Sequence, residues 1–235
     1  MNKLKEEQKY EQLRMLGKEL HIPMPEAFWE LEVRDKDGKV IQRHRERSHS
    51  WIRNAYNHLA SQLFAKNAND DTFGAGKLSI KKEDATVLYG TYPITLGYSS
   101  NCDIPPSGYL GSAGQNVVGI VVGTGTAAES FEDYKLDTKI ANGVGAGQLS
   151  YIVSDTHVIT YTAATKVLKD ELVRYLNNNS GGDITVNEVG IICNGYVGQS
   201  AKQWLQVRDK LAAGVTVPDT GQLKVTYTIQ LTYPA

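Results

Sequence analysis

The final residues carry the pattern that most limits how this chain folds. From Leu223 to Tyr233, apolar residues hold every second position and alternate with lysine, threonine and glutamine. Successive side chains of a β-strand point to opposite faces of a sheet, so this period of two predicts one buried face and one hydrated face rich in hydroxyl groups. We therefore expect the chain to end in a strand that lies inside a sheet.

Size, charge and cysteine content restrict the class of protein. A chain of 235 residues can bury a core without a metal or disulfide framework. Its formal net charge of -1 gives no overall field that would attract nucleic acid or an anionic membrane, and no apolar run is long enough to cross a bilayer. The charged start of the chain is unlike a signal peptide, and Cys102 and Cys193 fit no zinc or disulfide pattern. We expect free thiols and a soluble protein made in the cytosol.

The N-terminal segment, residues 1–25, predicts a helical arm. Residues 3–20 favour a helix, and prolines follow it at positions 23 and 25. A narrow apolar stripe runs along this helix at spacings of three and four residues, and it consists of Tyr10, Leu13, Leu16 and Leu20. The stripe has two interpretations: the helix packs on its own domain, or it docks on a neighbouring subunit.

Residues 26–66 predict a β-hairpin followed by a helix, as part of the main domain. The turn Asp35–Gly38 contains the Asp-Gly pair that a tight hairpin favours. Helical spacing of apolar residues from Trp51 onward predicts a helix that packs against a sheet, with Ser48 or Ser50 as its N-cap. In the second strand, Arg43, Arg45 and Arg47 share one face. They can bind a phosphate or an acidic partner, or they can form a solvated edge that discourages strand addition.

Residues 67–114 form a long insertion with short hairpins. Glycine, proline and asparagine clusters separate short strand-like pieces there, and a connection of this length often contacts a neighbouring protein. Four tyrosines are spread through it and are suited either to a contact surface or to packing on the core. They are Tyr89, Tyr92, Tyr98 and Tyr109.

Residues 115–235 predict the body of an antiparallel β-sandwich. Short apolar strands over 117–122, 148–153, 157–161 and 183–193 are separated by turn residues. Residues 164–177 are ambiguous, because apolar pairs recur at helical spacing while the turn that follows favours an antiparallel strand. We favour a strand over 170–177. The expected fold is mainly β: an antiparallel β-sandwich with an N-terminal helix and one further helix packed on the sheet.

The sequence shows no motif that would indicate catalysis or a bound cofactor. The run Gly123–Thr126 follows an apolar strand but has the spacing of neither a dinucleotide-binding nor a P-loop motif. Glu129, Glu132 and Asp133 lie on a polar segment where solvated carboxylates are expected. The histidines lack the spacing and companions of a metal site. We predict no catalytic residue, no cofactor and no metal site.

Three groups of segments resemble a family of tailed-bacteriophage and prophage virion structural proteins, of the minor structural, tail or capsid-accessory type. The segments are the hairpin and helix at 32–40 and 48–54, the central pieces at 123–126 and 130–136, and the closing pieces at 184–191, 207–209 and 215–219. The resemblance implies a β-sandwich subunit that assembles in many copies, with other virion structural proteins as partners and the virion as its location. Residues 1–25 and 67–114 have no counterpart in it.

The leading hypothesis is therefore a virion component, such as a capsid decoration, adaptor or tail-accessory subunit, that acts through protein-protein contacts and forms a homo-oligomer. Its partner-binding residues would be the helical stripe, the three arginines and the four tyrosines named above. The alternative is a glycan- or host-surface-binding β-sandwich, in which Trp29, Trp204 or exposed tyrosines stack on sugar rings.

Overall fold

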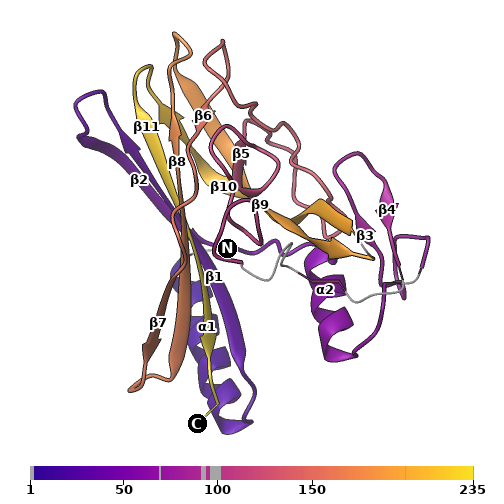
Figure 1. The fold of residues 1–235 in the computed structure, drawn as a ribbon. Coiled ribbons are helices and arrows are strands. Elements are labelled where there is room, and N and C mark those ends of the chain that lie inside the picture. The colour runs from indigo at the N-terminus through magenta and orange to yellow at the C-terminus, as the bar shows by residue number, and fades with distance from the viewer. Residues whose placement is uncertain (1–2, 69, 91–93, 96–101, 199, 235) are drawn as a thin grey trace.

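Two antiparallel sheets pack together, and two helices lie at their lower end, as the computed structural model in Figure 1 shows. The structure describes residues 3–68, 70–90, 94–95, 102–198 and 200–234. The helices are α1 (Lys3–Glu19) and α2 (Arg53–Leu63). The fold is mainly β, and the predicted β-sandwich with an N-terminal helix is confirmed.

The larger sheet, sheet A, places the C-terminal strand at its centre. Its strand order is β2-β1-β11-β8-β6, and β7 pairs with β8 beyond the end of β6. Every pair in it is antiparallel. The strands are β1 (Met24–Arg34), β2 (Val40–Arg47), β6 (Ser150–Tyr151), β7 (Val158–Thr162), β8 (Val167–Asn177) and β11 (Gln222–Thr232).

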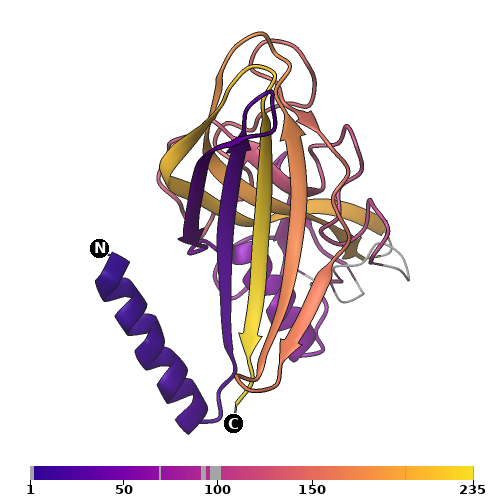
Figure 2. The same cartoon turned by 90° about the vertical axis from the view of Figure 1, so that its left-hand side faces the viewer.

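The smaller sheet, sheet B, has the order β10-β9-β5 and covers the upper part of sheet A (Figure 1). Its strands are β5 (Gly119–Gly123), β9 (Ile184–Val197) and β10 (Ser200–Val217). Within the insertion, β3 (Ile80–Lys81) and β4 (Val87–Leu88) form a separate short hairpin. Figure 2 shows sheet A from its outer side, with α1 beside the β1 edge and β7 at the opposite edge.

The main core lies between the two sheets. Leu223, Val225 and Tyr227 of β11 point into it, as the alternating sequence pattern predicts, and they are fully buried. Tyr227 packs against Trp29 of β1, with ring centroids 4.2 Å apart. A second, smaller cluster packs the insertion against the ends of β9 and β10, and it contains Ala68, Ile80, Ile94, Cys193, Val197 and Trp204. The insertion is therefore attached to the sandwich through its own apolar contacts.

Arg174 of β8 ties the two sheets together. Its side chain is fully buried and donates hydrogen bonds from all three guanidinium nitrogens. The acceptors are the backbone carbonyls of Ser112, Gln115, Val118, Ile120 and Ile152. Burial lowers the pKa of Arg174 to about 10, and its guanidinium lies 4.9 Å from the ring centre of Tyr151. A Cβ at Gly111 would collide with the Val118 carbonyl and this guanidinium, so the close approach requires glycine.

Residues 167–177 form a strand, which confirms the interpretation favoured for 170–177. Their apolar pattern looked helical because two of the positions that face the sandwich, Asp170 and Arg174, carry charges. The predicted N-cap of α2 is wrong. Its N-cap residue is Ile52, without a side-chain hydrogen bond. The Ser48 hydroxyl donates to Asp209 instead, and the backbone N–H of Ser50 donates to the same carboxylate.

Replacing Arg174 with methionine should lower the free energy of unfolding by about 3 kcal/mol or more, because several buried carbonyls would lose their donor. Urea unfolding followed by circular dichroism measures the change. Arg43→Met is the matched control, since the Arg43 side chain is 66% exposed, and it should cost less than about 1 kcal/mol. Equal losses in the two variants would show that Arg174 does not hold the sheets together.

Candidate functional site

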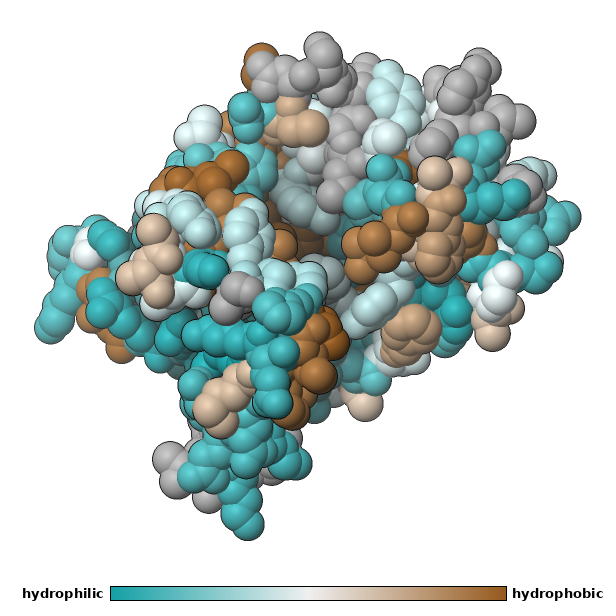
Figure 3. Space-filling view, turned by 90° about the horizontal axis from the view of Figure 1, so that it is seen from below, coloured by the Kyte–Doolittle hydropathy of each residue, from teal (hydrophilic) through white to brown (hydrophobic). Residues whose placement is uncertain are grey.

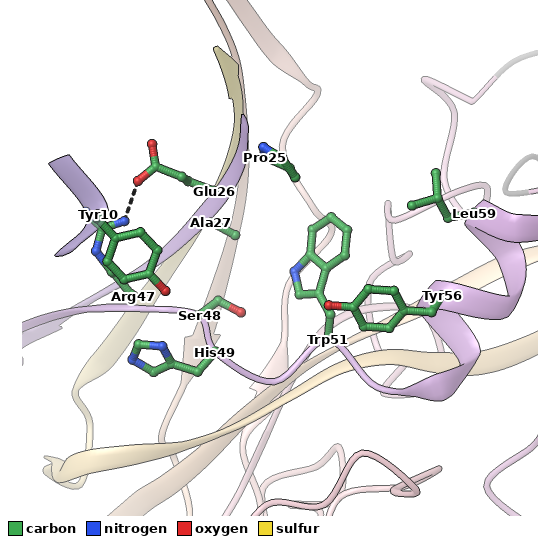
Figure 4. A pocket seen from close by; sticks show the side chains of 10 residues that line it. All are labelled: Tyr10, Pro25, Glu26, Ala27, Arg47, Ser48, His49, Trp51, Tyr56 and Leu59. Carbon is green, nitrogen blue, oxygen red and sulfur yellow. Dashed lines mark hydrogen bonds and ion pairs between the residues drawn. The ribbon is translucent and has the colours of Figure 1, made fainter. Parts of the chain in front are cut away.

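A cleft lies between sheet A and α2, lined by residues of both. Figure 1 shows that sheet A extends beyond sheet B at this lower end of the molecule and faces α2 there. Two adjoining cavities of about 240 and 260 Å³ form it, and both are lined by Trp51 and Leu59. We call these two cavities the lower cleft. Seen from below in Figure 3, the molecule is hollowed near its centre, with hydrophobic side chains beside the hollow. Figure 4 shows the first cavity from close by, with charged residues on one side and aromatic residues on the other.

The aromatic side of the cleft is fixed by hydrogen bonds. Trp51 Nε1 donates to the Tyr227 hydroxyl at 2.9 Å, and that hydroxyl donates to Ser48 Oγ at 3.3 Å. The ring of Tyr56, from α2, lies 6.5 Å from that of Trp51 between centroids and is tilted by 57°. Burial raises the pKa of Tyr227 above its usual value, so the hydroxyl remains protonated and able to donate at neutral pH.

The charged side of the cleft holds α1 against β1 and β2. Arg47 Nη1 donates to Glu26 Oε1 at 2.5 Å, and Arg14 of α1 reaches the same carboxylate at 2.9 Å. Arg47 also pairs with Glu7 at 2.8 Å, and its guanidinium carbon lies 3.8 Å from the ring centre of Tyr10. Burial raises the pKa of Glu26, but the hydrogen bonds from the two arginines outweigh it, and the pKa lies below its ordinary value. Glu26 therefore stays charged and anchors the helix.

Asp209 positions the segment that carries Trp51 into the cleft. Its buried carboxylate accepts hydrogen bonds from Trp29 Nε1 and Ser48 Oγ, both at 2.6 Å. The backbone N–H groups of His49 and Ser50 donate to its other oxygen at 2.7 and 3.1 Å. Burial raises the pKa of Asp209 and these donors oppose that effect. No local sequence pattern indicates this anchor, because its donors lie 159 to 180 residues away along the chain.

A second buried ion pair lies away from the cleft. Arg208 Nε donates to Glu188 Oε2 at 2.9 Å, and Arg208 Nη1 pairs with Asp133 at 2.6 Å. Glu188 also accepts the backbone N–H groups of residues 137 and 138, so the pair pins the segment 124–139 to sheet B. A Cβ at Gly123 or Gly125 would collide with the Glu188 carboxylate. The space beside this glycine run is therefore occupied by an acidic side chain, which would repel a phosphate.

The three carboxylates expected to be solvated all have partners within the chain. Glu132 pairs with Arg53, Asp133 with Arg208, and Glu129 accepts the N–H of Lys210 at 2.6 Å. These contacts attach the 124–139 segment to α2 and to sheet B. Each carboxylate is therefore engaged with a different partner, and the three do not form an acid/base pair.

The predicted partner-binding residues lie in different places. Leu13, Leu16 and Leu20 are 45%, 50% and 61% exposed, whereas Tyr10 faces the lower cleft. The three arginines have partners within the chain: Arg43 pairs with Glu32 at 2.7 Å, Arg45 lies over the Phe28 ring, and Arg47 binds Glu26.

The four tyrosines of the insertion do not form one surface among the described residues. Tyr89 is 54% exposed. Tyr109 packs against both hydrophobic clusters, which gives it the core-packing role that the sequence left open. Tyr92 and Tyr98 lie outside the described residues.

Comparisons with known proteins give no relative: no family model, curated protein or solved structure matches the chain. Among the described residues, no helix is both long and apolar enough to span a membrane. Cys102 is an exposed cysteine and Cys193 a buried one, and no disulfide joins them. The function therefore has to be argued from the geometry of this chain alone.

His58, in the wall of the second cavity, should make stability depend on pH. Burial lowers the pKa of His58 to about 4 from an unfolded value of 6.5. The unfolded chain thus binds this proton at a higher pH than the folded chain, and stability falls as the pH drops from 6.5 to 4. Between these pH values the original chain should lose on the order of 2 kcal/mol of its free energy of unfolding, measured by urea unfolding at each pH. His58→Gln should remove this loss. His49→Gln removes an exposed histidine and should keep the slope of the original chain; an unchanged slope in His58→Gln would contradict the prediction.

Proposed function

We propose that this chain is a non-catalytic structural subunit of a tailed-bacteriophage virion and acts through protein-protein contacts. The observation that carries the proposal is the orientation of α1. Ion pairs and Tyr10 hold one side of the helix to the domain, while Leu13, Leu16 and Leu20 remain exposed. An amphipathic helix whose apolar residues face solvent normally has a partner on that side.

The distribution of charge supports a contact role over a catalytic one. The strongly buried ionisable groups Glu26, Arg174, Glu188, Arg208 and Asp209 are each engaged in several hydrogen bonds within the chain. They connect sheets, loops and α1, so they stabilise the fold. A general acid or base would instead need a polar atom directed at a substrate.

Other elements of the lower end also expose apolar residues. Leu63 and Phe64, at the C-terminal end of α2, are strongly exposed, as are Ile159 and Tyr161 of β7. Contacts between permanent subunits bury surface of this kind on the order of 800 Å² per partner or more. A subunit that presents apolar residues from three elements is suited to more than one neighbour in an assembly.

The glycan-binding alternative loses its main aromatic candidates. Trp29 and Trp204 are fully buried, so neither can stack on a sugar ring at the surface. Trp51 and Tyr56 line the lower cleft, but their tilted rings do not form a flat platform. We expect the purified chain to bind nothing on a glycan array; binding that Tyr56→Ala abolishes would favour the alternative.

The virion role predicts that the α1 leucines are needed for incorporation. Leu16→Glu combined with Leu20→Glu should reduce the amount of this chain in purified particles by roughly tenfold or more, because two charges would be placed in an apolar contact. Quantitative mass spectrometry of particles, relative to the main capsid protein, measures the loss.

The matched control is Gln8→Glu with Gln12→Glu, which adds the same charge to exposed positions of the same helix. Circular dichroism checks that both variants fold. Particles that lack the chain altogether would overturn the virion role, and equal incorporation of the two variants would show that α1 is not the contact.

A further inference from the structure

We infer that β7 is a pairing edge for a second copy of this chain, so that two copies join their A sheets antiparallel through Val158–Thr162. The inference names the partner and the edge that the proposed assembly role would use, but its evidence is separate from that of α1. It rests on the open backbone of β7, on its composition and on the symmetry of its sequence.

β7 is a sheet edge with one free side. It pairs only with β8, from Val158 opposite Glu171 to Thr162 opposite Val167. Within the described part of the chain, no other strand pairs with it. All five residues are exposed, and Val158, Ile159 and Tyr161 are 48%, 66% and 53% accessible. The strand lies at the margin of sheet A, as Figure 2 shows.

The composition of β7 favours pairing. An exposed edge is usually protected from strand addition by a lysine, a proline or a bulge. Val158-Ile159-Thr160-Tyr161-Thr162 contains no charge and no proline, and every residue in it has a high β-propensity. At the other edge of the sheet, β2 carries three arginines and is partly covered by β10, through hydrogen bonds such as Ala212 N–H to Glu46. The β2 and β7 edges of sheet A are therefore unlike, and β7 lacks the charges that protect β2.

The strand is also held in place before any partner arrives. His157 Nδ1 lies 2.7 Å from Asp170 Oδ2 at the start of β7, and the rings of Tyr161 and Tyr233 are 5.9 Å apart near its end. The backbone N–H of Tyr233 donates to Lys166 in the turn that follows β7. An edge that is already ordered loses less conformational entropy on pairing.

The sequence of β7 is complementary to itself in one antiparallel register. With Thr160 opposite Thr160 of the partner subunit, Ile159 lies opposite the partner's Tyr161, and Val158 lies opposite the partner's Thr162. Pairs of an aromatic with a β-branched residue, and of two threonines, are favourable across antiparallel strands. Tyr161 lies opposite Leu168 and Ile159 lies opposite Asp170 on the same face of sheet A, so pairing would bring the apolar residues Ile159 and Tyr161 of the two copies together on one face of the joined sheet.

A contact of five residues on each side is small, so we expect a dimer that depends on concentration. Sedimentation velocity on the purified chain over a range of concentrations should show monomer and dimer. Thr160→Lys should weaken the dimer about fivefold or more, because two like charges would lie opposite each other on the two-fold axis. Thr160→Glu should do the same, and an equal mixture of the two variants should restore the dimer. Thr185→Lys, at an exposed threonine of β9, is the matched control and should dimerise as the original chain does.

Disulfide trapping tests the register. In a background with Cys102→Ser, which removes the exposed thiol, Thr160→Cys should form a covalent dimer under mild oxidation, since directly opposite residues have Cα atoms about 5 Å apart. Ile159→Cys should trap far less dimer, because its opposite residue is Tyr161 of the partner subunit. A chain that stays monomeric at every concentration, or a dimer that Thr160→Lys leaves intact, would overturn the inference. Both measurements use purified protein, so they are independent of whether the chain enters particles.

Discussion

The guanidinium group of Arg174 is the contact on which the arrangement of the two sheets depends. It reaches from β8 of sheet A to β5 of sheet B and to the connection that precedes β5, and it meets only backbone carbonyls there. Five N–H groups in one plane let a single side chain satisfy five acceptors from three separate segments. Because this contact joins the sheets in their upper part, sheet A continues below it without a covering sheet. The lower cleft and the free half of sheet A follow from that geometry.

The other buried charges connect parts of the chain in the same way. Glu26 joins α1 to the hairpin, Asp209 joins the β2–α2 connection to β10, and Arg208 with Glu188 joins the 124–139 segment to sheet B. A buried charge is costly unless several hydrogen bonds stabilise it, and each of these groups has them. The buried charges are thus engaged in holding the domain together.

Local sequence patterns predicted the elements whose stabilising contacts follow their own periodicity. β11, the β1–β2 hairpin and the two helices were predicted because apolar spacing and turn residues coincide there. β10 was not predicted, because residues 204–209 are buried at six consecutive positions that include Gln206, Arg208 and Asp209. Such a run shows no alternation of apolar and polar residues. Its charged residues, Arg208 and Asp209, are stabilised by partners that are distant in the sequence, namely Glu188, Trp29 and Ser48.

The sequence predicted less of the candidate site than of the fold. The leucine stripe and the arginine face were visible as patterns, but the direction in which each points depends on tertiary contacts. Arg47 turns inward to Glu26, which no local rule indicates, because the glutamate lies 21 residues earlier on the neighbouring strand. The lower cleft joins residues from α1, β1, α2 and β11, so it exists only after the sheets have packed.

Two apolar surfaces on opposite edges of sheet A have different consequences for assembly. A β7 pair is isologous, since the same strand contributes from both copies, and it closes after two subunits. It cannot by itself extend into a filament. Helix α1 lies beside β1, on the side of the sheet away from β7 (Figure 2), and a β7 pair does not use its exposed leucines. A closed pair would therefore present two copies of the α1 stripe, and a partner that binds α1 would meet two equivalent sites related by the two-fold axis.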